Sequence, residues 1–222
     1  MSATDKTPES LEELEASLQS LSHDIQPLSI IQSFAKNIGK TKARQKLFNA
    51  NGALVRPPIE YQVLLDQGAI ALEEDPFILL QGDIISSDAA YFMGERITGT
   101  KFAIASSTCD LIPNRRRYAT LLRLQPITVD NPYAKQLLGE MLKFTSTQRM
   151  YLPPLPGDSE TILANAILFD GLIQIRLEDL LMSTRHASLS LVGWRIFGSL
   201  VRTIMVRAGE SEVKMRTNLP IE

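Results

Sequence analysis

Apolar residues near the N-terminus recur at intervals of three and four, which is the spacing of one helix face. Ser10 begins a capping box with Glu13 three positions later. The seam then runs through Leu11, Leu14, Leu18, Leu21 and Ile25, before Pro27 interrupts it. This pattern predicts an acidic heptad helix within residues 1–28. The seam is too short for a stable free coiled coil, so two roles stay open. The helix packs on its own domain, or these five residues bind a protein partner or a second copy.

A second amphipathic segment follows. Its apolar positions are Ile30, Ile31, Phe34 and Ile38, and they predict a helix that ends near Gly39. A basic stretch comes next, made of Lys36, Lys40, Lys42, Arg44 and Lys46. It lacks the first glycine and the preceding strand of a phosphate loop, so we interpret it as a solvated helix face or a phosphate contact. With turn residues near 51 and 57 and a short helix predicted at 61–71, residues 29–75 are interpreted as a helical appendage and linker.

From Pro76 the pattern changes to strands. Segments rich in large and β-branched apolar residues alternate with turn residues, at 77–86, 101–106, 118–128, 150–152 and 166–181. From Ala187 to Ile204 apolar residues recur with helical period, which predicts a closing helix. Arg195 and Arg202 fall together on the opposite face of that helix. We therefore expect an α+β fold, in which N-terminal helices precede a small SH3-like β-barrel closed by a C-terminal helix. The barrel domain is assigned to residues 76–208 and a tail to 209–222.

Composition and charge narrow the picture only slightly. The chain has 222 residues, of which 44% are hydrophobic, and a net charge of −2. Its first 100 residues carry 14 acidic against 8 basic residues, while residues 101–222 carry 11 against 15. The second part is therefore the better candidate for an anionic partner. An acidic N-terminus without an apolar core, and a single cysteine, favour a cytoplasmic protein. The arginines in the closing helix argue against a membrane span.

Candidate chemistry gathers between two predicted strands, in residues 101–128. The loop between them holds Cys109, Asp110 and three consecutive arginines, Arg115, Arg116 and Arg117. With Tyr118 beside them, the arginines are suited to bind phosphates while the ring stacks on a base. Consecutive residues in a strand or tight turn cannot all face one way, so at most two arginines should contact one ligand. Arg195 and Arg202 are candidates to extend the same nucleic-acid surface, and a solvated hairpin tip is the alternative.

The residues present offer two further candidate site types, a nucleophilic cysteine and a metal centre. Cys109 could form a nucleophilic triad with His186 and either Asp110 or Asp170, although they are far apart in sequence. Two histidines and one cysteine cannot make a standard zinc site. A carboxylate site would have to come from Asp83, Asp88 and Asp110. We therefore expect no metal and no cofactor.

The order of short motifs over residues 80–208 resembles the MazF/PemK-type toxin barrel. The matching segments are Gly82-Asp83-Ile84, Gly94-Glu95, Gly99 to Ser106, Pro126-Ile127-Thr128, and Phe169-Asp170-Gly171 with Gln174-Ile175-Arg176. Members of that family are metal-independent endoribonucleases, usually dimers that pair with an antitoxin. The resemblance places Lys101 at the family's catalytic arginine and Thr128 at its catalytic threonine or serine. Lys101 lacks the bidentate fork of arginine, and Phe102 replaces the family's proline.

These observations leave three hypotheses for function. The first is a cytoplasmic module that binds single-stranded nucleic acid, preferably RNA, on a toxin-like barrel that has lost catalysis. The second is a metal-independent endoribonuclease that uses Lys101 and Thr128. The third is a protein-interaction or assembly factor that acts through the N-terminal helix. The first two hypotheses draw mainly on residues 101–128, and the third draws on the N-terminal helix.

Overall fold

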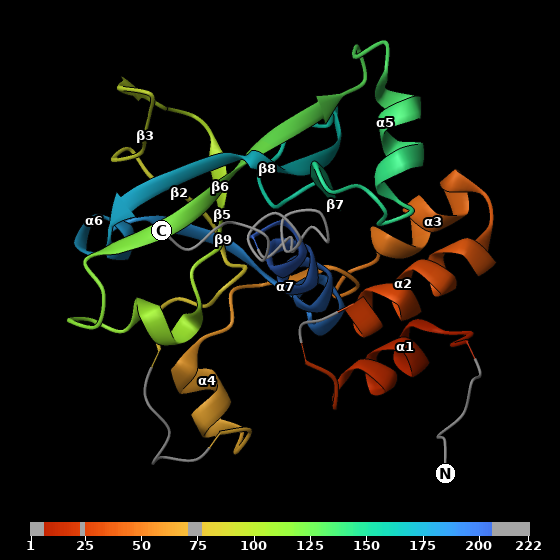
Figure 1. Ribbon diagram of the computed structural model, residues 1–222, viewed down its shortest axis with the longest axis horizontal. Helices are drawn as coiled ribbons and strands as arrows, with labels where there is room; N and C mark the ends of the chain where they lie inside the picture. The colour runs from red at the N-terminus through yellow and green to blue at the C-terminus, as the bar shows by residue number, and fades with distance from the viewer. Residues whose placement is uncertain (1–6, 23–24, 71–76, 206–222) are drawn as a thin grey trace, which may run out of the picture.

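A computed structural model describes residues 7–22, 25–70 and 77–205 of the chain (Figure 1). The tail assigned to 209–222 lies outside the described residues. The helices are α1 (Leu11–Leu18), α2 (Ile25–Ile38), α3 (Thr41–Phe48), α4 (Tyr61–Asp66), α5 (Ala134–Met141), α6 (Leu177–Leu181) and α7 (Leu191–Met205), with a 3₁₀ turn η1 (Thr108–Leu111). The strands are β1 (Val55–Arg56), β2 (Ile84–Ser86), β3 (Tyr91–Phe92), β4 (Glu95–Arg96), β5 (Lys101–Ile104), β6 (Tyr118–Thr128), β7 (Arg149–Leu152), β8 (Ile162–Arg176) and β9 (Thr184–Leu189).

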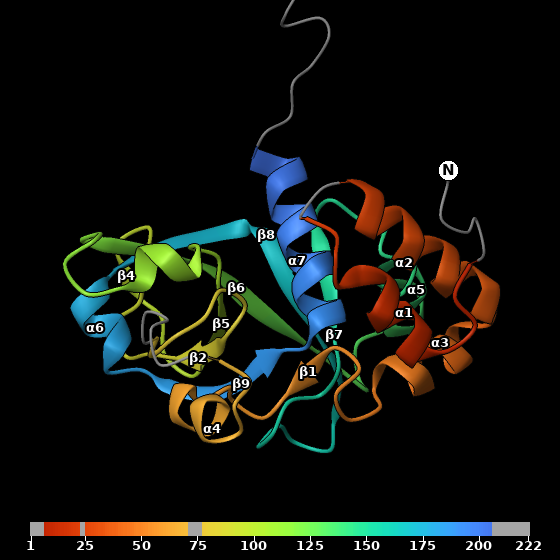
Figure 2. The same ribbon diagram turned by 90° about the horizontal axis from the view of Figure 1, so that it is seen from below.

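Seven strands form one antiparallel sheet in the order β1-β9-β2-β5-β6-β8-β7. The sheet curls into a half-barrel, with β8 and β6 on one side and β2 and β9 on the other (Figure 2). A separate hairpin, β3–β4, lies beside it. The fold is therefore mixed helix and sheet, as the sequence predicted, and its sheet is an open, curled one in which β1 and β7 are the edges.

Irregular pairing accompanies the curl of the two longest strands. The register between β6 and β8 shifts between Leu122 and Leu124, and again between Ile127 and Thr128. Such bulges bend a strand and increase its twist. Gly171 lies at the first of these places, where a Cβ atom would approach Arg123 Cβ to 3.1 Å. The absence of a side chain at Gly171 therefore lets β8 pass close to β6 at the bend.

Two apolar clusters lie on opposite faces of the central strands. Ile84, Ala103 and Leu122 belong to a large cluster shared with the helices, whereas their neighbours Ile85 and Phe102 belong to a smaller cluster. The smaller one is completed by residues of β6, β8, η1 and α6: Leu111, Ala119, Leu121, Ile173, Ile175, Leu177 and Leu180. The alternation follows from the two-residue period of a strand, and it shows that this part of the sheet is covered on both faces.

Helix α7 lies between the curled sheet and the N-terminal helices (Figure 2). Both its apolar face and the expected polar face are buried over the first ten residues, and Ser199 is fully buried. Gly193 permits this position, because a Cβ atom there would lie 2.2 Å from Leu54 O. The prediction that the helix begins at Ala187 was wrong, since residues 184–189 form β9 and the helix begins at Leu191. Pairing with β2 determines this boundary.

The N-terminal helices are part of the large core and not an attachment to it. Leu14 and Leu18 of α1 are completely buried among residues of α2, α7 and the sheet. Leu11 and Leu21 pack partly against the same cluster, and Ile25 is 72% exposed. The continuous seam up to Pro27 was not found, because α1 ends at Leu18 and a new helix begins at Ile25. Proline is compatible with the first turn of that helix, where amide groups lack intrahelical partners.

Other segments match the sequence predictions unevenly. β6 has the predicted bounds, and β5 lies within the predicted segment. Of residues 77–86 only Ile84–Ser86 form a strand, because Gly82 adopts a φ of +86° and Asp83 closes a turn on Leu80. Residues 162–176 are one long strand followed by a short helix. Within the described residues, no helix is both long enough and apolar enough to cross a membrane.

Candidate functional site

The three consecutive arginines line a groove at the α6 end of the molecule. Its walls come from two segments: residues 113–117, which follow η1, and residues 176–181, which include α6. The groove has a volume of about 500 Å³ and adds a fourth cation, Arg176, to the three predicted ones. We call this set, Arg115, Arg116, Arg117 and Arg176, the arginine groove. The sheet creates it, because β6 and β8 pair Tyr118 opposite Arg176.

Carboxylates neutralise part of the positive charge of the arginine groove. Arg116 Nε lies 3.2 Å from Asp110 Oδ1, and Arg176 pairs with Glu178 at 2.9 Å and Asp179 at 2.8 Å. Arg115 donates to the backbone carbonyl of Cys109 at 3.3 Å. In the described part of the chain, Arg115 and Arg117 have no ion pair with a carboxylate. These two arginines therefore carry the uncompensated charge of the groove.

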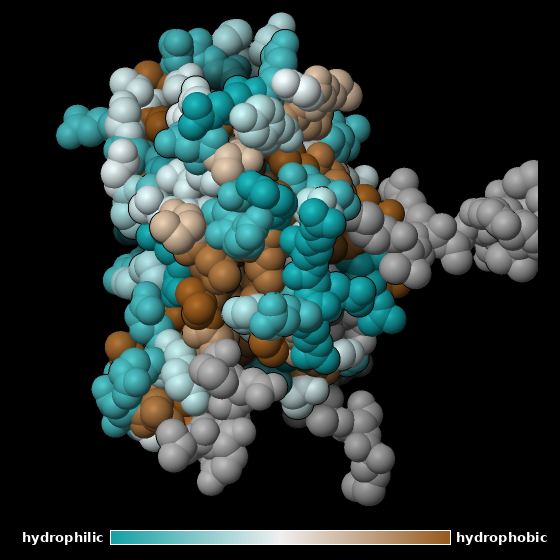
Figure 3. All heavy atoms as spheres, turned by 90° about the vertical axis from the view of Figure 1, so that its left-hand side faces the viewer, coloured by the Kyte–Doolittle hydropathy of each residue, from teal (hydrophilic) through white to brown (hydrophobic). Residues whose placement is uncertain are grey.

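Tyr118 supplies an aromatic surface beside the groove. Its ring is 48% exposed, and the Arg117 guanidinium lies 5.5 Å from its centroid. The face of the molecule on the side of α6 mixes hydrophilic side chains with an apolar area at its centre (Figure 3). Sequence reasoning missed Arg176 as a groove residue. In the sequence, Arg176 stands out only through the Gln-Ile-Arg pattern at 174–176, and the pairing of two distant strands brings it to the loop.

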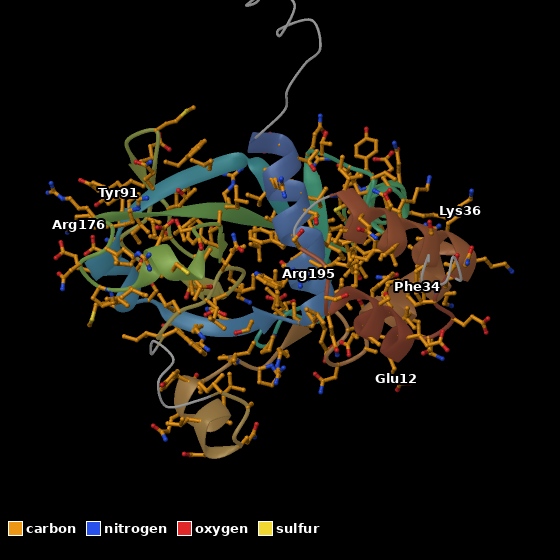
Figure 4. The ribbon with its side chains drawn as sticks, turned by 60° about the horizontal axis from the view of Figure 1, so that its bottom comes forward. Glu12, Phe34, Lys36, Tyr91, Arg176 and Arg195 are labelled. Atoms are coloured by element: carbon orange, nitrogen blue, oxygen red, sulfur yellow. The ribbon has the colours of Figure 1, made fainter. Side chains whose placement is uncertain are left out.

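The remaining predicted arginines lie elsewhere. Arg195 is on α7, in the middle of the molecule, whereas Arg176 is at its outer end (Figure 4). Arg195 is buried, and its guanidinium donates to Leu18 O at 3.2 Å and Gln19 O at 3.3 Å. It therefore satisfies carbonyl groups at the end of α1. Arg202 is exposed two turns further along α7. The structure does not bring either residue into the arginine groove.

Lys101, the predicted catalytic cation, forms a largely buried ion pair. Its Nζ lies 2.5 Å from Asp158 Oδ1, in the connection between β7 and β8. Asp158 also accepts hydrogen bonds from Leu155 N and Asn165 Nδ2, both at 2.7 Å. Burial raises the pKa of Asp158, but these hydrogen bonds and the charge of Lys101 outweigh it and hold the pKa below its ordinary value. The pair links β5 to the far end of the sheet.

Thr128 is not beside Lys101. It is the last residue of β6 and pairs with Ile162, whereas Phe102, next to Lys101, pairs with Arg123. Continuing this antiparallel register puts Lys101 opposite Leu124, and Thr128 lies four residues further along β6, which is about 13 Å at about 3.3 Å per residue. Thr128 instead donates to Asp130, and this hydrogen bond holds the pKa of that carboxyl below its ordinary value. In this structure Lys101 and Thr128 therefore bond to different carboxylates, Asp158 and Asp130.

A histidine and a serine that the sequence did not pair lie near Lys101. His186 Nε2 is 2.8 Å from Ser86 Oγ, and Ser86 lies opposite Lys101 in the β2–β5 ladder. The register between β2 and β9 shifts at this point, so His186 is the extra residue of a bulge. Burial lowers the pKa of His186, and the charge of Lys101 lowers it further, against the opposite effect of Asp158. A neutral imidazole bonded to a hydroxyl can act as a general base.

The proposed cysteine triad and carboxylate metal site lack support in the geometry. Cys109 is exposed in η1, while His186 is bonded to Ser86. Asp83 is completely buried and bonded to Leu80 N and Ser188 Oγ. Among the described residues, no three His, Cys, Asp or Glu side chains are grouped closely enough to hold a metal ion. Comparison with known proteins adds no candidate, since no family model, curated protein or solved structure matches this chain.

Proposed function

We propose that the protein binds single-stranded nucleic acid through the arginine groove. The observation that carries this proposal is the position of Tyr118, a half-exposed ring at the edge of a groove lined by four arginines. Guanidinium groups bind phosphate oxygens, and an exposed ring offers a stacking surface for a base. Arg115 and Arg117 are the first candidates for phosphate contacts because no carboxylate neutralises them within the described residues.

The geometry favours a single strand over a duplex. The groove carries one ring beside two uncompensated cations, which suits a backbone followed by an unstacked base. Binding of this kind depends on salt and little on sequence. The half-barrel and the motif order support a further proposal, that the sheet is a degenerate SH3-like barrel related to the MazF/PemK type.

The test is retention of labelled single-stranded RNA at low salt in EDTA, read on native and denaturing gels. The variant Arg115→Ala/Arg116→Ala/Arg117→Ala should lose retention. The matched control Lys42→Ala/Lys46→Ala/Lys135→Ala removes three exposed cations from α3 and α5 and should retain RNA as the wild type does. Equal retention by the two variants, or equal loss, would refute binding at the groove.

A second candidate function is RNA cleavage at the Ser86–His186 pair. The observation that favours it is the 2.8 Å contact between the two side chains beside a lysine. His186 would take the proton of the RNA 2′-hydroxyl as that oxygen bonds to phosphorus, the P–O5′ bond would break, and the leaving 5′-oxygen would gain a proton from water. Lys101 would stabilise charge on the phosphorus oxygens, without a metal. Cleaved RNA on the denaturing gel, abolished by His186→Gln and retained by Thr128→Ala, would support this assignment over the one that uses Thr128. Intact RNA with the wild type would exclude it.

A further inference from the structure

A second basic pocket lies in the helical half of the molecule, away from the arginine groove. Its walls come from α2, from the start of α3 and from the segment that follows α5. Eight residues line it: Ser29, Gln32, Ser33, Lys36, Gly39, Arg44, Lys143 and Thr145. Its volume is about 640 Å³, which is within the range of pockets for small molecules. Lys36 lies on α2 at the outer side of this half (Figure 4). We call this set of residues the helical pocket.

The charge of the helical pocket has one sign. Three of its lining residues, Lys36, Arg44 and Lys143, are cations, and none of the described residues that line it is acidic. Lys36 and Lys143 are exposed, so their ammonium groups can reach a ligand without unfolding the walls. Cations that converge on one hollow without a counter-charge favour an anionic ligand.

The buried side chain of Arg44 is a second, independent indication that the helical pocket binds an anion. Its side chain is only 8% exposed, yet its Nε is buried and has no hydrogen-bond partner in the part of the chain that the structure describes. Nη1 reaches Leu142 O at the long distance of 3.5 Å. A buried guanidinium with an unsatisfied donor is costly unless an acceptor is supplied. Arg44 also lines the helical pocket, so an anion there would place acceptor atoms beside its guanidinium.

The wall opposite α2 is held in position. Gln32 Nε2 donates to Phe144 O at 2.7 Å, and Phe144 adopts a φ of +54°. Its ring is buried, with its centroid 5.0 Å from that of Phe48. Because Phe144 is anchored in the core, its neighbours Lys143 and Thr145 are fixed at the edge of the pocket. The backbone that carries Lys143 is therefore preorganised, which lowers part of the entropic cost of binding.

We infer that the helical pocket binds the phosphate group of a small phosphorylated ligand. Arg44 would form the inner contact, and Lys36 and Lys143 would close over the outer oxygens. The hydroxyl groups of Ser33 and Thr145 and the amide of Gln32 offer hydrogen bonds to the rest of the ligand. The phosphate could belong to a free small molecule or to the end of an oligonucleotide, and the experiment distinguishes these sources. The inference does not depend on the function proposed for the arginine groove.

The test is isothermal titration of the full chain with inorganic pyrophosphate, and with a short RNA carrying either a 5′-phosphate or a 5′-hydroxyl. The variant Lys36→Gln/Lys143→Gln should weaken pyrophosphate binding by about tenfold or more. The control Lys42→Gln/Lys135→Gln removes two exposed cations from the same helical half, outside the pocket, and should bind as the wild type does. All four substitutions are at exposed positions, so both variants should fold.

The outcomes separate the two sources of phosphate. A loss confined to the pocket variant supports the site. Binding of pyrophosphate without discrimination between the two RNAs assigns it to a small molecule. A preference for the 5′-phosphorylated RNA, lost in the pocket variant, assigns it to an oligonucleotide end. No pyrophosphate binding by the wild type, or equal weakening in the control, would overturn the inference. The variant Arg44→Lys, which keeps the charge but loses the guanidinium donors, should bind less tightly than the wild type.

Discussion

Lys101 Nζ lies 2.5 Å from Asp158 Oδ1, and this contact joins the first residue of β5 to the connection between β7 and β8. The carboxylate is held by two further donors, Leu155 N and Asn165 Nδ2. Asp158 therefore depends on Lys101 for its counter-charge, and Lys101 contributes to the structure whatever its part in chemistry. Any loss of activity on replacing Lys101 has to be separated from loss of this ion pair.

Replacing Lys101 with Met should destabilise the fold by about 2 kcal/mol, because a largely buried carboxylate loses its only ion pair within the described residues. The measurement is urea unfolding at neutral pH. The double variant Lys101→Met/Asp158→Asn should be less destabilised than the sum of its single variants, since the charge left unpaired by the first change is removed by the second. Strictly additive effects would mean that the two side chains do not interact.

The stability of the fold should depend on His186 below pH 6.5. Burial and Lys101 lower the pKa of the folded imidazole from its ordinary 6.5, so the unfolded chain binds a proton more readily than the folded one. The contribution of neutral His186 is present above pH 6.5 and is lost as the pH falls from there through the lowered pKa. In His186→Gln the free energy of unfolding should fall less steeply between pH 6.5 and 5. Parallel pH profiles for the two proteins would contradict this assignment.

Replacing Arg195 with Met should loosen α1 more than the rest of the molecule. Arg195 donates to Leu18 O and Gln19 O at the end of that helix, where carbonyl groups lack intrahelical partners. We expect faster hydrogen exchange of the α1 amides and a loss of about 1–2 kcal/mol. Arg202→Met, at an exposed position of the same helix, is the control. Unchanged exchange in α1 would show that the guanidinium does not hold it.

Two glycine-to-alanine substitutions should change the stability of the fold in opposite directions. Ala at Gly193 would place Cβ 2.2 Å from Leu54 O, a backbone atom that cannot move aside alone, so α7 would have to shift. We expect a loss of at least about 2 kcal/mol. Ala at Gly139 in α5 meets only Thr41 Oγ1 at 3.7 Å and should stabilise by about 0.5–1 kcal/mol. Thermal unfolding of both variants checks the two predictions. A Gly193→Ala variant as stable as the wild type would contradict the packing of α7.

Phosphate contacts in the arginine groove should contribute to the salt dependence of RNA binding. Each phosphate contact to a single strand contributes roughly 0.7 to the slope of log K against log salt. If Arg115 and Arg117 supply two contacts, the variant Arg115→Ala/Arg117→Ala should reduce that slope by about 1.4. Arg116→Ala alone should change it less, because Arg116 already pairs with Asp110. An unchanged slope would place the RNA elsewhere on the protein.

Residue patterning alone was enough to predict those elements whose signal is local. Alternating and continuous apolar runs predicted β5 and β6, and the Ser10 capping box predicted the start of α1, where Ser10 Oγ accepts from Glu13 N. The concentration of arginines in a loop between strands was visible for the same reason. The periodicity from Ala187 onward was misleading at its start, because alternation over a few residues does not distinguish β9 from the first turn of a helix.

Which distant residues meet depends on the three-dimensional packing of the chain. Arg176 joins the arginine groove through the pairing of β6 with β8, and His186 reaches Ser86 through a bulge between β2 and β9. Arg195, which appeared to lie on a polar surface, is buried because α1 covers that face of α7. Such contacts depend on strand register and on how helices pack. Neither can be predicted from the spacing of residues along one segment. The elements are local in origin, and the candidate sites are products of long-range packing.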